Sequence, residues 1–517
     1  MNRRDFLATA GSATLLALSG QKAAAAEQAQ PAGPAAQPNR RAPNILLLMA
    51  DQHKPSCLGV EGDAVAHTPN LDRLARESVR FTSAYCTNPV CAPSRASMMT
   101  GLYTHTLHDH MDRPYGPRFE TLPISFGNAG YFTALIGKMH AVDAQLHGFQ
   151  YQLEFNDWFQ AIGPATRLYA DELGGPNSGA GQPQIKGLWH RHDPWKGHRT
   201  PDDRLGPVAV GRPSLMPEEQ HFEEFVASET VHFLETYAEQ DRPFFLVSSF
   251  LKPHDPFMPA ERFAAMYEPE QMRLSPTWGK AHLDKIPNRV RYEIEHSPFT
   301  PELVHPADAK KRTAYYYGNL AQMDECAGKV LDALTRLGLD QNTIVVYTSD
   351  HGEMLGDLGL WNKFQFYQGS CGVPLMFRLP GSSPATCETP VSLISLYSTM
   401  TDLCGVPRAK PNEGASFAHL VRDPASKQGY GPVFSEFSLG NSAAKFMIRD
   451  GQWKYTYWVD DMPELYDLSA DPQELNNLAP EARYAPKIAQ LKEKLFAWYT
   501  PPAWHGETPR TFFGKQI

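Results

Sequence analysis

Four short apolar runs, each followed at once by ionisable or amide side chains, constrain the fold of this chain more than any other feature. The runs are Asn44–Ala50, Tyr131–Ile136, Phe244–Phe250 and Thr343–Ser349. Continuous apolar runs of this length are typical of parallel strands that are buried on both faces of a sheet. Amphipathic segments at 218–237 and 312–337 lie between them and predict helices that cover the sheet. The alternation predicts an α/β layered fold.

The residues that follow these runs are the first candidates for a functional site. They are Asp51 and Gln52 after the first run, Lys138 and His140 after the second, Lys252-Pro253-His254 after the third, and Asp350 and His351 after the fourth. In open parallel sheets, ligands bind at the carboxyl ends of the strands. One such residue is most often a solvated loop residue, but four coincidences of position favour a single shared crevice.

The stretch from Cys91 to Gly101 places a small reactive side chain before Pro93, with Arg95 one turn beyond the cysteine. The proline predicts the start of a helix, whose unpaired N–H groups and positive dipole end attract anions. A nucleophile at Cys91, with Arg95 on the same face, is placed to attack an oxyanion ester. A buried thiol that packs as a small hydrophobe is the alternative for Cys91.

This stretch, Cys91-Ala92-Pro93-Ser94-Arg95 with Thr100-Gly101, resembles the signature of the type I sulfatases, and Gly130–His140 resembles the second motif of that family. Further similarity is found at His147-Gly148-Phe149, Lys252-Pro253-His254, Lys363, Leu465–Leu468, Asp471-Pro472 and Glu474. The resemblance runs in the family's order from residue 43 to the C-terminus, and we assign no motif to residues 150–240. It implies an alkaline phosphatase-like fold, with a large, mostly parallel mixed sheet flanked by helices.

In that family the cysteine is converted by a maturation enzyme to formylglycine, whose hydrated aldehyde is the nucleophile. The resemblance therefore implies this modification of Cys91. It also implies one divalent ion per chain, held by the modified Cys91 together with Asp51, Gln52, Asp350 and His351. For His351 the alternative is a hydrogen-bond donor to the nucleophile rather than a direct ligand. Hard oxygen ligands suit Ca²⁺ or Mg²⁺, whereas imidazole is less usual for either ion. An exported enzyme meets more Ca²⁺ than a cytoplasmic one, so we expect Ca²⁺.

The charges of the remaining candidates indicate their roles. The cations expected to neutralise the oxygens of a sulfate ester are Arg95, Lys138, His254 and Lys363. Asp350 is the expected base for the attacking hydroxyl, and His254 or Lys363 is the expected acid for the departing alcohol. His140 is the expected base for release of the sulfate. An ordinary loop side chain is the alternative for each of these histidines and for Lys363.

Gln52 departs from the usual pair of aspartates in the family and lowers the charge of the ligand set by one. It resembles a subset that includes bacterial phosphonate monoester hydrolases and choline-sulfatase-like enzymes. The favoured function is a sulfatase that cleaves a small-molecule or carbohydrate sulfate monoester to an alcohol and sulfate. A phosphonate monoester or phosphodiester hydrolase, and a non-catalytic protein that binds sulfated sugars, remain alternatives. Asp143 and His147 have the spacing of a two-zinc phosphatase, but the His-Gly-Phe resemblance explains His147 better.

Composition excludes one class of partner. The formal net charge is −9 with no long basic run, which argues against nucleic acid but leaves room for a local cationic pocket. The segment from Phe155 to Gln220 is a candidate substrate loop or a solvated cover, because it is rich in Gly, Pro, His, Arg and Trp. The residues expected at the rim of the pocket are His105, His108, Asp109, His110 and Arg113.

The N-terminus predicts export. Arg3-Arg4 belongs to a twin-arginine pattern, and we expect a signal peptide over 1–26 and a disordered leader over 27–42. The expected partners are therefore the twin-arginine export machinery and the formylglycine-generating maturation enzyme. The mature protein is expected in the periplasm or outside the cell, without a membrane segment.

The last part of the chain predicts a second, smaller sheet. Short alternating runs predict strands at 433–437, 445–449, 452–458 and 464–468, with a helix at 486–499. These elements predict an antiparallel sheet packed against one helix. We expect a catalytic domain over 43–425 and a C-terminal subdomain over 426–517.

Overall fold

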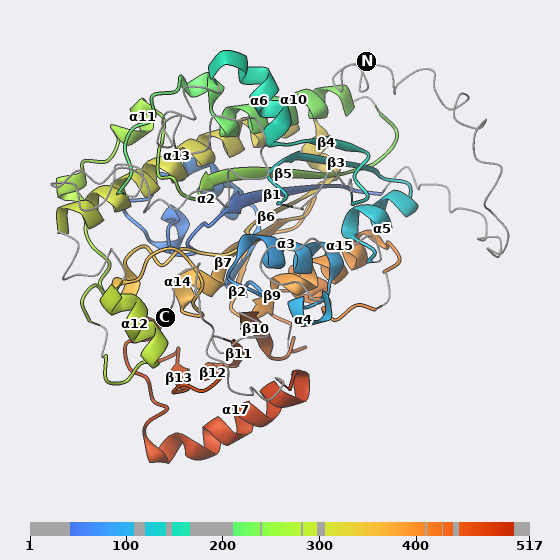
Figure 1. Cartoon of the computed structure of the whole chain (residues 1–517). Coiled ribbons are helices and arrows are strands. Elements are labelled where there is room, and N and C mark those ends of the chain that lie inside the picture. Colours follow the sequence, from blue (N-terminus) through green and yellow to red (C-terminus); the bar gives the residue numbers. More distant parts are fainter. Residues whose placement is uncertain are drawn as a thin grey trace, which may run out of the picture.

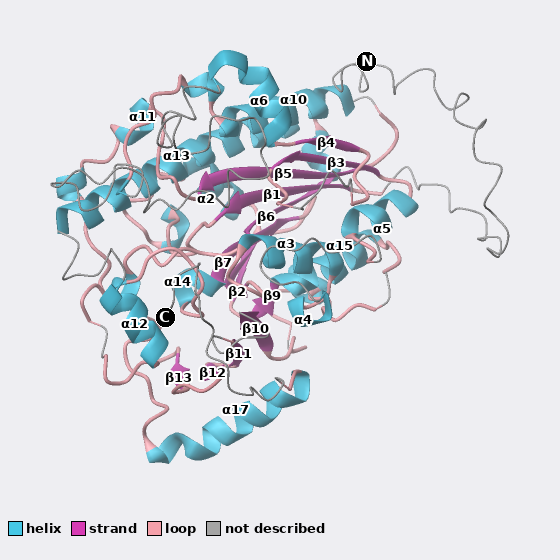
Figure 2. Cartoon of the chain, in the orientation of Figure 1, coloured by secondary structure: helices cyan, strands magenta, loops and turns pink. Residues whose placement is uncertain are grey.

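The computed structural model of the chain describes residues 42–107, 119–140, 147–165, 210–237, 240–280, 283–296, 306–408, 411–426, 428–437 and 444–500. Within these ranges nine strands form one large sheet in the order β4-β3-β5-β1-β6-β7-β2-β8, with β9 paired to β2 (Figure 2). The strands are β1 Asn44–Asp51, β2 Val79–Tyr85, β3 Phe132–Gly137, β4 Tyr151–Leu153, β5 Phe244–Pro253, β6 Thr343–Ser349, β7 Gly372–Arg378, β8 Ala385–Cys387 and β9 Val391–Ser392.

The four predicted runs form four neighbouring strands at the centre of this sheet. β3, β5, β1 and β6 pair in parallel, and Ile45 of β1 lies opposite Phe245 on one side and Ile344 on the other. Every residue of the four strands is buried. A strand that is covered on both faces has no solvated side to select polar residues, which explains the unbroken apolar runs. The predicted α/β fold is confirmed.

The sheet is mixed toward the β8 edge. β7 runs antiparallel to both of its neighbours, β6 and β2, whereas β2 pairs in parallel with β8 and β9. The expectation of a large, mostly parallel mixed sheet is therefore confirmed as well.

Helices cover both faces of the sheet (Figure 1). Alternate residues of β1 point to opposite faces, so that Leu46 and Leu48 join one apolar core while Ile45 and Leu47 join the other. The first core is covered by α2 Pro69–Ala75, α6 Phe155–Ile162, α10 Phe222–Tyr237, α11 Glu261–Ala264 and α13 Pro306–Arg336. The second is covered by α3 Cys91–Thr100, α5 Leu122–Asn128, α15 Leu396–Cys404 and α16 Ala418–Arg422. Further short helices are α4 Thr104–Leu107, α12 Asn288–His296 and α14 Gln368–Cys371.

A second sheet follows in the last part of the chain, as predicted. In the described residues it has four antiparallel strands in chain order, β10 Val433–Phe437, β11 Lys445–Asp450, β12 Trp453–Trp458 and β13 Glu464–Asp467. Leu491 and Leu495 of α17 (Ala485–Trp498) pack with Phe446, Ile448 and Tyr455 of this sheet. The helix therefore covers one face of the small sheet (Figure 1).

Some predictions lie outside the described residues. They concern the signal peptide at 1–26, the leader up to residue 41, residues 166–209 of the candidate substrate loop, Asp143, and the rim residues His108, Asp109, His110 and Arg113. Within the part of the chain that the structure describes, helices long and apolar enough to span a bilayer are absent.

Candidate active site

The carboxyl ends of the central strands bring the sequence-predicted residues into one buried cluster. Asp51 is the last residue of β1, and Asp350 and His351 follow β6 directly. Lys138 follows β3 and His254 follows β5. Because these strands are parallel neighbours, all of these side chains emerge at the same edge of the sheet.

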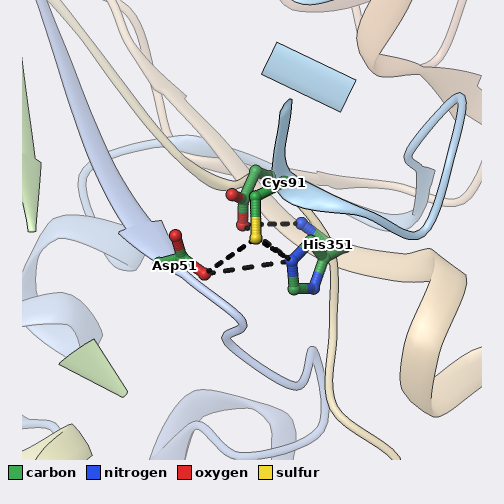
Figure 3. A group of neighbouring side chains, drawn as sticks. Asp51, Cys91 and His351 are labelled. Atoms are coloured by element: carbon green, nitrogen blue, oxygen red, sulfur yellow. Dashed lines mark hydrogen bonds and ion pairs between the residues drawn. The ribbon is translucent and has the colours of Figure 1, made fainter. Parts of the chain in front are cut away.

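Cys91 lies at the centre of this cluster, at the first position of helix α3 (Figure 3). Its Sγ is 3.1 Å from Nε2 of His351, 3.1 Å from Nζ of Lys363 and 3.8 Å from Oδ1 of Asp51. The other ring nitrogen of His351 lies 2.9 Å from the carbonyl oxygen of Gly352, which fixes the ring with Nε2 toward the sulfur. The side chain that the sequence pattern marked is therefore surrounded by ionisable groups.

The charges around Cys91 favour an ionised side chain at this position. Burial raises the pKa of the Cys91 thiol, but neighbouring positive groups outweigh burial and hold this pKa well below its usual value. Those groups are Lys138, Lys363 and His351. The site is thus built to stabilise negative charge at residue 91.

Arg95 joins the two carboxylates of the site. Its Nε donates to Oδ2 of Asp350 at 2.7 Å, and its Nη2 donates to Oδ2 of Asp51 at 3.1 Å. Nη1 donates to the carbonyl oxygen of Lys138 at 2.5 Å and to Oγ of Ser249 at 3.0 Å. The guanidinium is 1% exposed, so its hydrogen bonds are made to protein groups within the cluster. Its planar fork is suited to holding two carboxylates at a fixed separation.

Two lysines supply further positive charge. Nζ of Lys138 forms an ion pair with Oδ2 of Asp51. Nζ of Lys363 lies 2.9 Å from Oε1 of Gln52 and 2.8 Å from Nε2 of His254, in addition to its contact with Cys91. Burial lowers the pKa of Lys363, but the negative charges around it outweigh burial and raise that pKa. Lys363 is therefore a cation that touches both Cys91 and His254.

His140 is the third histidine of the cluster. It is hydrogen-bonded to Cys91, and its backbone has a φ of 61°, in the left-handed region. Burial is the main cause of its lowered pKa, because a desolvated imidazolium is unfavourable. His140 is thus a neutral imidazole next to residue 91.

The donor set fits a divalent metal ion. One ligand atom from each of Asp51, Cys91, Asp350 and His351 can be chosen so that the four atoms lie within 4.8 Å of one another, and all four residues are buried. Gln52 follows Asp51 with a φ of 64°, and its amide oxygen lies 2.9 Å from Nζ of Lys363. Two carboxylates and an amide oxygen are the ligands that Ca²⁺ and Mg²⁺ prefer.

Two residues that sequence reasoning missed hold Gln52 in place. Its Nε2 donates to Oε2 of Glu353 and lies 3.5 Å from Oδ1 of Asp255. With the amide nitrogen fixed in this way, Oε1 faces Lys363. Glu353 follows Asp350-His351-Gly352, and Asp255 follows His254. Their position next to predicted site residues is the sequence feature that could have identified them.

A small cavity of about 30 Å³ adjoins the cluster at His254. Its lining includes Trp158, Met216, Phe222, Met258 and Glu223. Lys252 also lines this cavity, and its Nζ donates to the carbonyl oxygen of Met258 at 3.1 Å. Of the tripeptide Lys252-Pro253-His254, the histidine thus contacts the cluster through Lys363, while the lysine supports the cavity.

Comparison with known proteins identifies relatives along most of the chain. The family model for sulfatases matches residues 43–406, and the model for the C-terminal part of N-sulphoglucosamine sulphohydrolase matches residues 356–500. A choline-sulfatase of Rhizobium meliloti (strain 1021) is 33% identical over 456 residues, which cover 85% of this chain and 83% of the relative. An arylsulfatase of Clostridium perfringens (strain 13 / Type A) is 30% identical over 468 residues, covering 88% and 93%.

The fold also matches solved structures. The phosphonate monoester hydrolase of Agrobacterium radiobacter superposes with a TM-score of 0.71 at 25% identity, covering 88% of this chain and 95% of the other. Fold and site together define a hydrolase of the alkaline phosphatase-like superfamily. Within that class the chain belongs to the sulfatase family, whose enzymes hydrolyse sulfate esters. The resemblance drawn from the motifs is therefore confirmed, and the chain is a sulfatase.

Proposed function

We propose that this sulfatase cleaves sulfate monoesters with a formylglycine made from Cys91 as the nucleophile and one divalent ion beside it. The observation that supports this proposal most directly is the position of Cys91 Sγ. It lies 3.1 Å from both His351 Nε2 and Lys363 Nζ, at the carboxyl ends of the central strands. The net reaction converts R–O–SO₃⁻ and water to R–OH and HSO₄⁻. The hydrated aldehyde supplies one hydroxyl for attack on sulfur and a second for the elimination of sulfate.

The ion is proposed to be Ca²⁺, with Mg²⁺ as the second candidate. Its proposed ligands are Asp51, Gln52, Asp350, His351 and the modified residue 91. A bound divalent ion supplies positive charge to the oxygens of the sulfate ester. The mutual approach of the buried donor atoms supports this assignment.

Asp350 is the proposed base for the attacking hydroxyl. Its Oδ1 accepts hydrogen bonds from the backbone N–H groups of Gln52 and His351, and its Oδ2 accepts from Arg95. Each carboxylate oxygen has two lone pairs, so these three hydrogen bonds leave one site on Oδ2, which can take a proton only while the ion does not occupy it. We propose that Arg95 acts by holding Asp350 and Asp51, since its hydrogen bonds are made to these groups.

Lys363 and His254 form the proposed acid pair for the departing alcohol. Their nitrogens lie 2.8 Å apart, so one group can replace the proton that the other donates. Lys138 is proposed to neutralise charge beside Asp51. His140, a neutral imidazole hydrogen-bonded to residue 91, is the proposed base for release of the sulfate.

The proposed substrate is a small-molecule or carbohydrate sulfate monoester. The names of the two relatives point to choline sulfate and aryl sulfates as the first compounds to examine. The small cavity beside His254, lined by Trp158 and Phe222 together with charged residues such as Glu223 and Lys252, lies next to the proposed acid. A phosphonate monoester hydrolase is the second candidate, favoured by Gln52 and by the solved structure of that activity.

The test is a side-by-side measurement of kcat/KM on aryl sulfate, choline sulfate and aryl phosphonate. The proposal predicts the highest value on a sulfate, and a higher value on the phosphonate would transfer the assignment to the second candidate. Peptide mass analysis of residue 91 should show an aldehyde, in which oxygen has replaced the sulfur and two hydrogen atoms have been lost relative to the serine that a simple exchange would give. An intact thiol with no turnover would instead favour a protein that only binds sulfated sugars. Cys91→Ala is the matched inactive control.

The metal assignment has its own test. Chelation should abolish turnover, and Ca²⁺ should restore it better than Mg²⁺ does. Asp51→Asn should weaken Ca²⁺ binding and shift half-activation to a higher Ca²⁺ concentration, because it removes a charged ligand. Full turnover after exhaustive chelation would refute the metal.

The location and organisation of the chain are also proposals. We propose export by the twin-arginine machinery after folding, cleavage of residues 1–26, a leader at 27–42, and a periplasmic or secreted mature enzyme. The proposed catalytic domain covers 43–425 and the proposed C-terminal subdomain covers 426–517. N-terminal sequencing of the protein from a cell fraction tests the export proposal.

A further inference from the structure

Lys363 lies in a loop whose backbone adopts unfavourable φ angles. The residues on either side of it, Asn362 and Phe364, have φ angles of 63° and 80°, in the left-handed region that side chains other than glycine rarely adopt. Such a conformation persists only where the surroundings impose it. On the N-terminal side, the backbone N–H of Asn362 donates to Oε1 of Glu353 at 2.6 Å. The C-terminal side of the loop needs a comparable support.

The residues after Phe364 are held by the C-terminal sheet, one after another. Lys445 on β11 donates to Oε1 of Gln365 at 2.5 Å. Lys454 on β12 donates to the carbonyl oxygen of Phe366, and the hydroxyl of Tyr367 donates to Oε1 of Glu464 on β13 at 2.6 Å. The backbone N–H of Gln368 donates to Oε2 of Glu474 at 2.7 Å. Three strands of the small sheet and the turn beyond β13 thus hold four consecutive residues, the last three of the loop and the first of α14.

Lys454 and Glu474 are the centre of this support. They form an ion pair with each other, with side-chain exposures of 1% and 2%. Lys454 also lies 3.3 Å from Oε1 of Gln368, so the pair contacts Phe366 and Gln368 together. A buried ion pair contributes little net stability compared with apolar residues of the same size, but it fixes geometry through its directed hydrogen bonds.

We propose that the buried pair Lys454–Glu474 positions the loop that carries Lys363, and thereby sets the acid of the reaction against the departing alcohol. Neither residue touches the cluster around Cys91, so both are positioning residues. This inference rests on the proposed role of Lys363. It gives the C-terminal sheet a task in catalysis in addition to its share in the fold.

The test is a double-mutant cycle between Lys363 and the pair. Lys454→Met/Glu474→Leu removes both charges together, which avoids leaving one charge buried without a partner. If the pair acts through Lys363, this change should lower kcat on a poor leaving group about tenfold in the otherwise unchanged enzyme. In the Lys363→Ala enzyme the same change should lower kcat by less than about twofold.

The dependence on the leaving group separates positioning from a general loss of structure. A displaced acid matters most when the departing alkoxide is basic, so the loss of kcat should grow along a series of aryl sulfates as the pKa of the phenol rises. Tyr367→Phe removes one hydroxyl from the same support and should show the same trend on a smaller scale. Lys494→Met, which breaks an ion pair with Asp450 elsewhere on the small sheet, is the control and should show none.

The outcomes are distinct. The positioning proposal would be overturned if Lys454→Met/Glu474→Leu lowered kcat equally in the wild-type and Lys363→Ala enzymes, or if the loss of kcat were equal across the aryl sulfates. Either result would leave the proposed function intact. An unchanged kcat in Lys363→Ala would overturn the assigned acid and the inference with it. If Lys454→Met/Glu474→Leu unfolds, as shown by its thermal melt, Tyr367→Phe decides the question by the same cycle.

Discussion

Arg95 illustrates how one buried side chain can hold the charged groups of a site together. The sequence motif predicts that Arg95 lies on the same helix as Cys91 and neutralises the oxygens of a sulfate ester. In the structure its guanidinium lies between Asp51 and Asp350. Two carboxylates that accept hydrogen bonds from the same guanidinium lie close together and would repel each other without that cation. Arg95 therefore makes the pair of carboxylates possible.

Arg95→Lys should lower kcat by at least about a hundredfold, since a lysine keeps the charge but cannot bind both carboxylates through a planar fork. It should also lower the free energy of unfolding by about 3 kcal/mol, the cost of partly unpairing buried charges. Steady-state kinetics and urea denaturation measure these two effects. Arg73→Lys, in an exposed ion pair with Asp332, is the control and should change neither by a measurable amount.

His105 provides a pH-dependent prediction at the residue scale. Its Nδ1 lies 2.7 Å from Oε2 of Glu436, and its ring stacks on Tyr499. Burial lowers the pKa of His105, but the bond to Glu436 outweighs burial and raises that pKa above 6.5. A raised pKa in the folded state means stabilisation that is fully present below about pH 6.5 and is lost as the pH rises through the folded-state value.

The difference in unfolding free energy between the wild type and His105→Gln should therefore be larger at about pH 6 than at about pH 9, by about 1 kcal/mol. Urea denaturation at the two pH values checks this. A difference that stays constant with pH would show that the pair is not charged at pH 6. Glu436→Gln should remove the same pH-dependent component, because it removes the other partner.

At the scale of elements, the sequence predicts the strands whose apolar runs are unbroken. It does not predict strands whose runs are interrupted by exposed polar residues or by proline. β1, β3, β5 and β6 were predicted to within a few residues of their observed ends. β2 was missed because Thr82 lies on the surface, so its apolar run is interrupted, and β7 was missed because Pro374 interrupts it. Proline and exposed polar residues both lower the strand signal, and only pairing with distant strands overcomes them.

The close packing of the ends of β3 and β5 depends on a glycine. Gly137 ends β3 with a φ of 109°, and a Cβ at this position would lie 1.9 Å from the carbonyl oxygen of Ser249 on β5. The two backbones come closest at the point where the chain leaves β3 and continues to Lys138 and His140. A side chain at residue 137 would push the two strand ends apart.

Gly137→Ala should lower the free energy of unfolding by about 3 kcal/mol or more and reduce turnover, because it combines backbone strain with a clash against a main-chain atom. Gly451→Ala is the matched control. Gly451 also has a positive φ, of 59°, but open space surrounds the added carbon, so its cost should be about 1 kcal/mol with turnover unchanged. Equal effects of the two substitutions in denaturation experiments would contradict the assigned clash.

At the scale of the whole molecule, the two sheets share one apolar core. Val433, Phe437 and Met447 of the small sheet belong to the same buried cluster as Ile45 and Leu47 of the large one. The family motifs near the C-terminus thus have a physical explanation, because they surround residues that hold the loop after Lys363. The sequence could reveal both sheets but not the contacts of the small sheet with the loop after Lys363, since pairs such as Gln365 with Lys445 leave no local pattern.

Because of this shared core, the described parts of both sheets should unfold in a single transition. Urea curves followed by tryptophan fluorescence and by far-ultraviolet circular dichroism should coincide. Two separated transitions would show that the small sheet is an independent unit. Phe437→Ala, at the contact between the sheets, should shift both probes together by about 3 kcal/mol.

The backbone N–H of Glu436 donates to the carbonyl oxygen of Thr87, and the hydroxyl of Ser435 donates to that of Cys86, 349 positions earlier in the chain. The segment just ahead of Cys91 is therefore hydrogen-bonded to residues that are synthesised late in translation. A nascent chain that has emerged only as far as the end of the large sheet lacks these bonds. Translation must be nearly finished before the reactive centre can take its final shape.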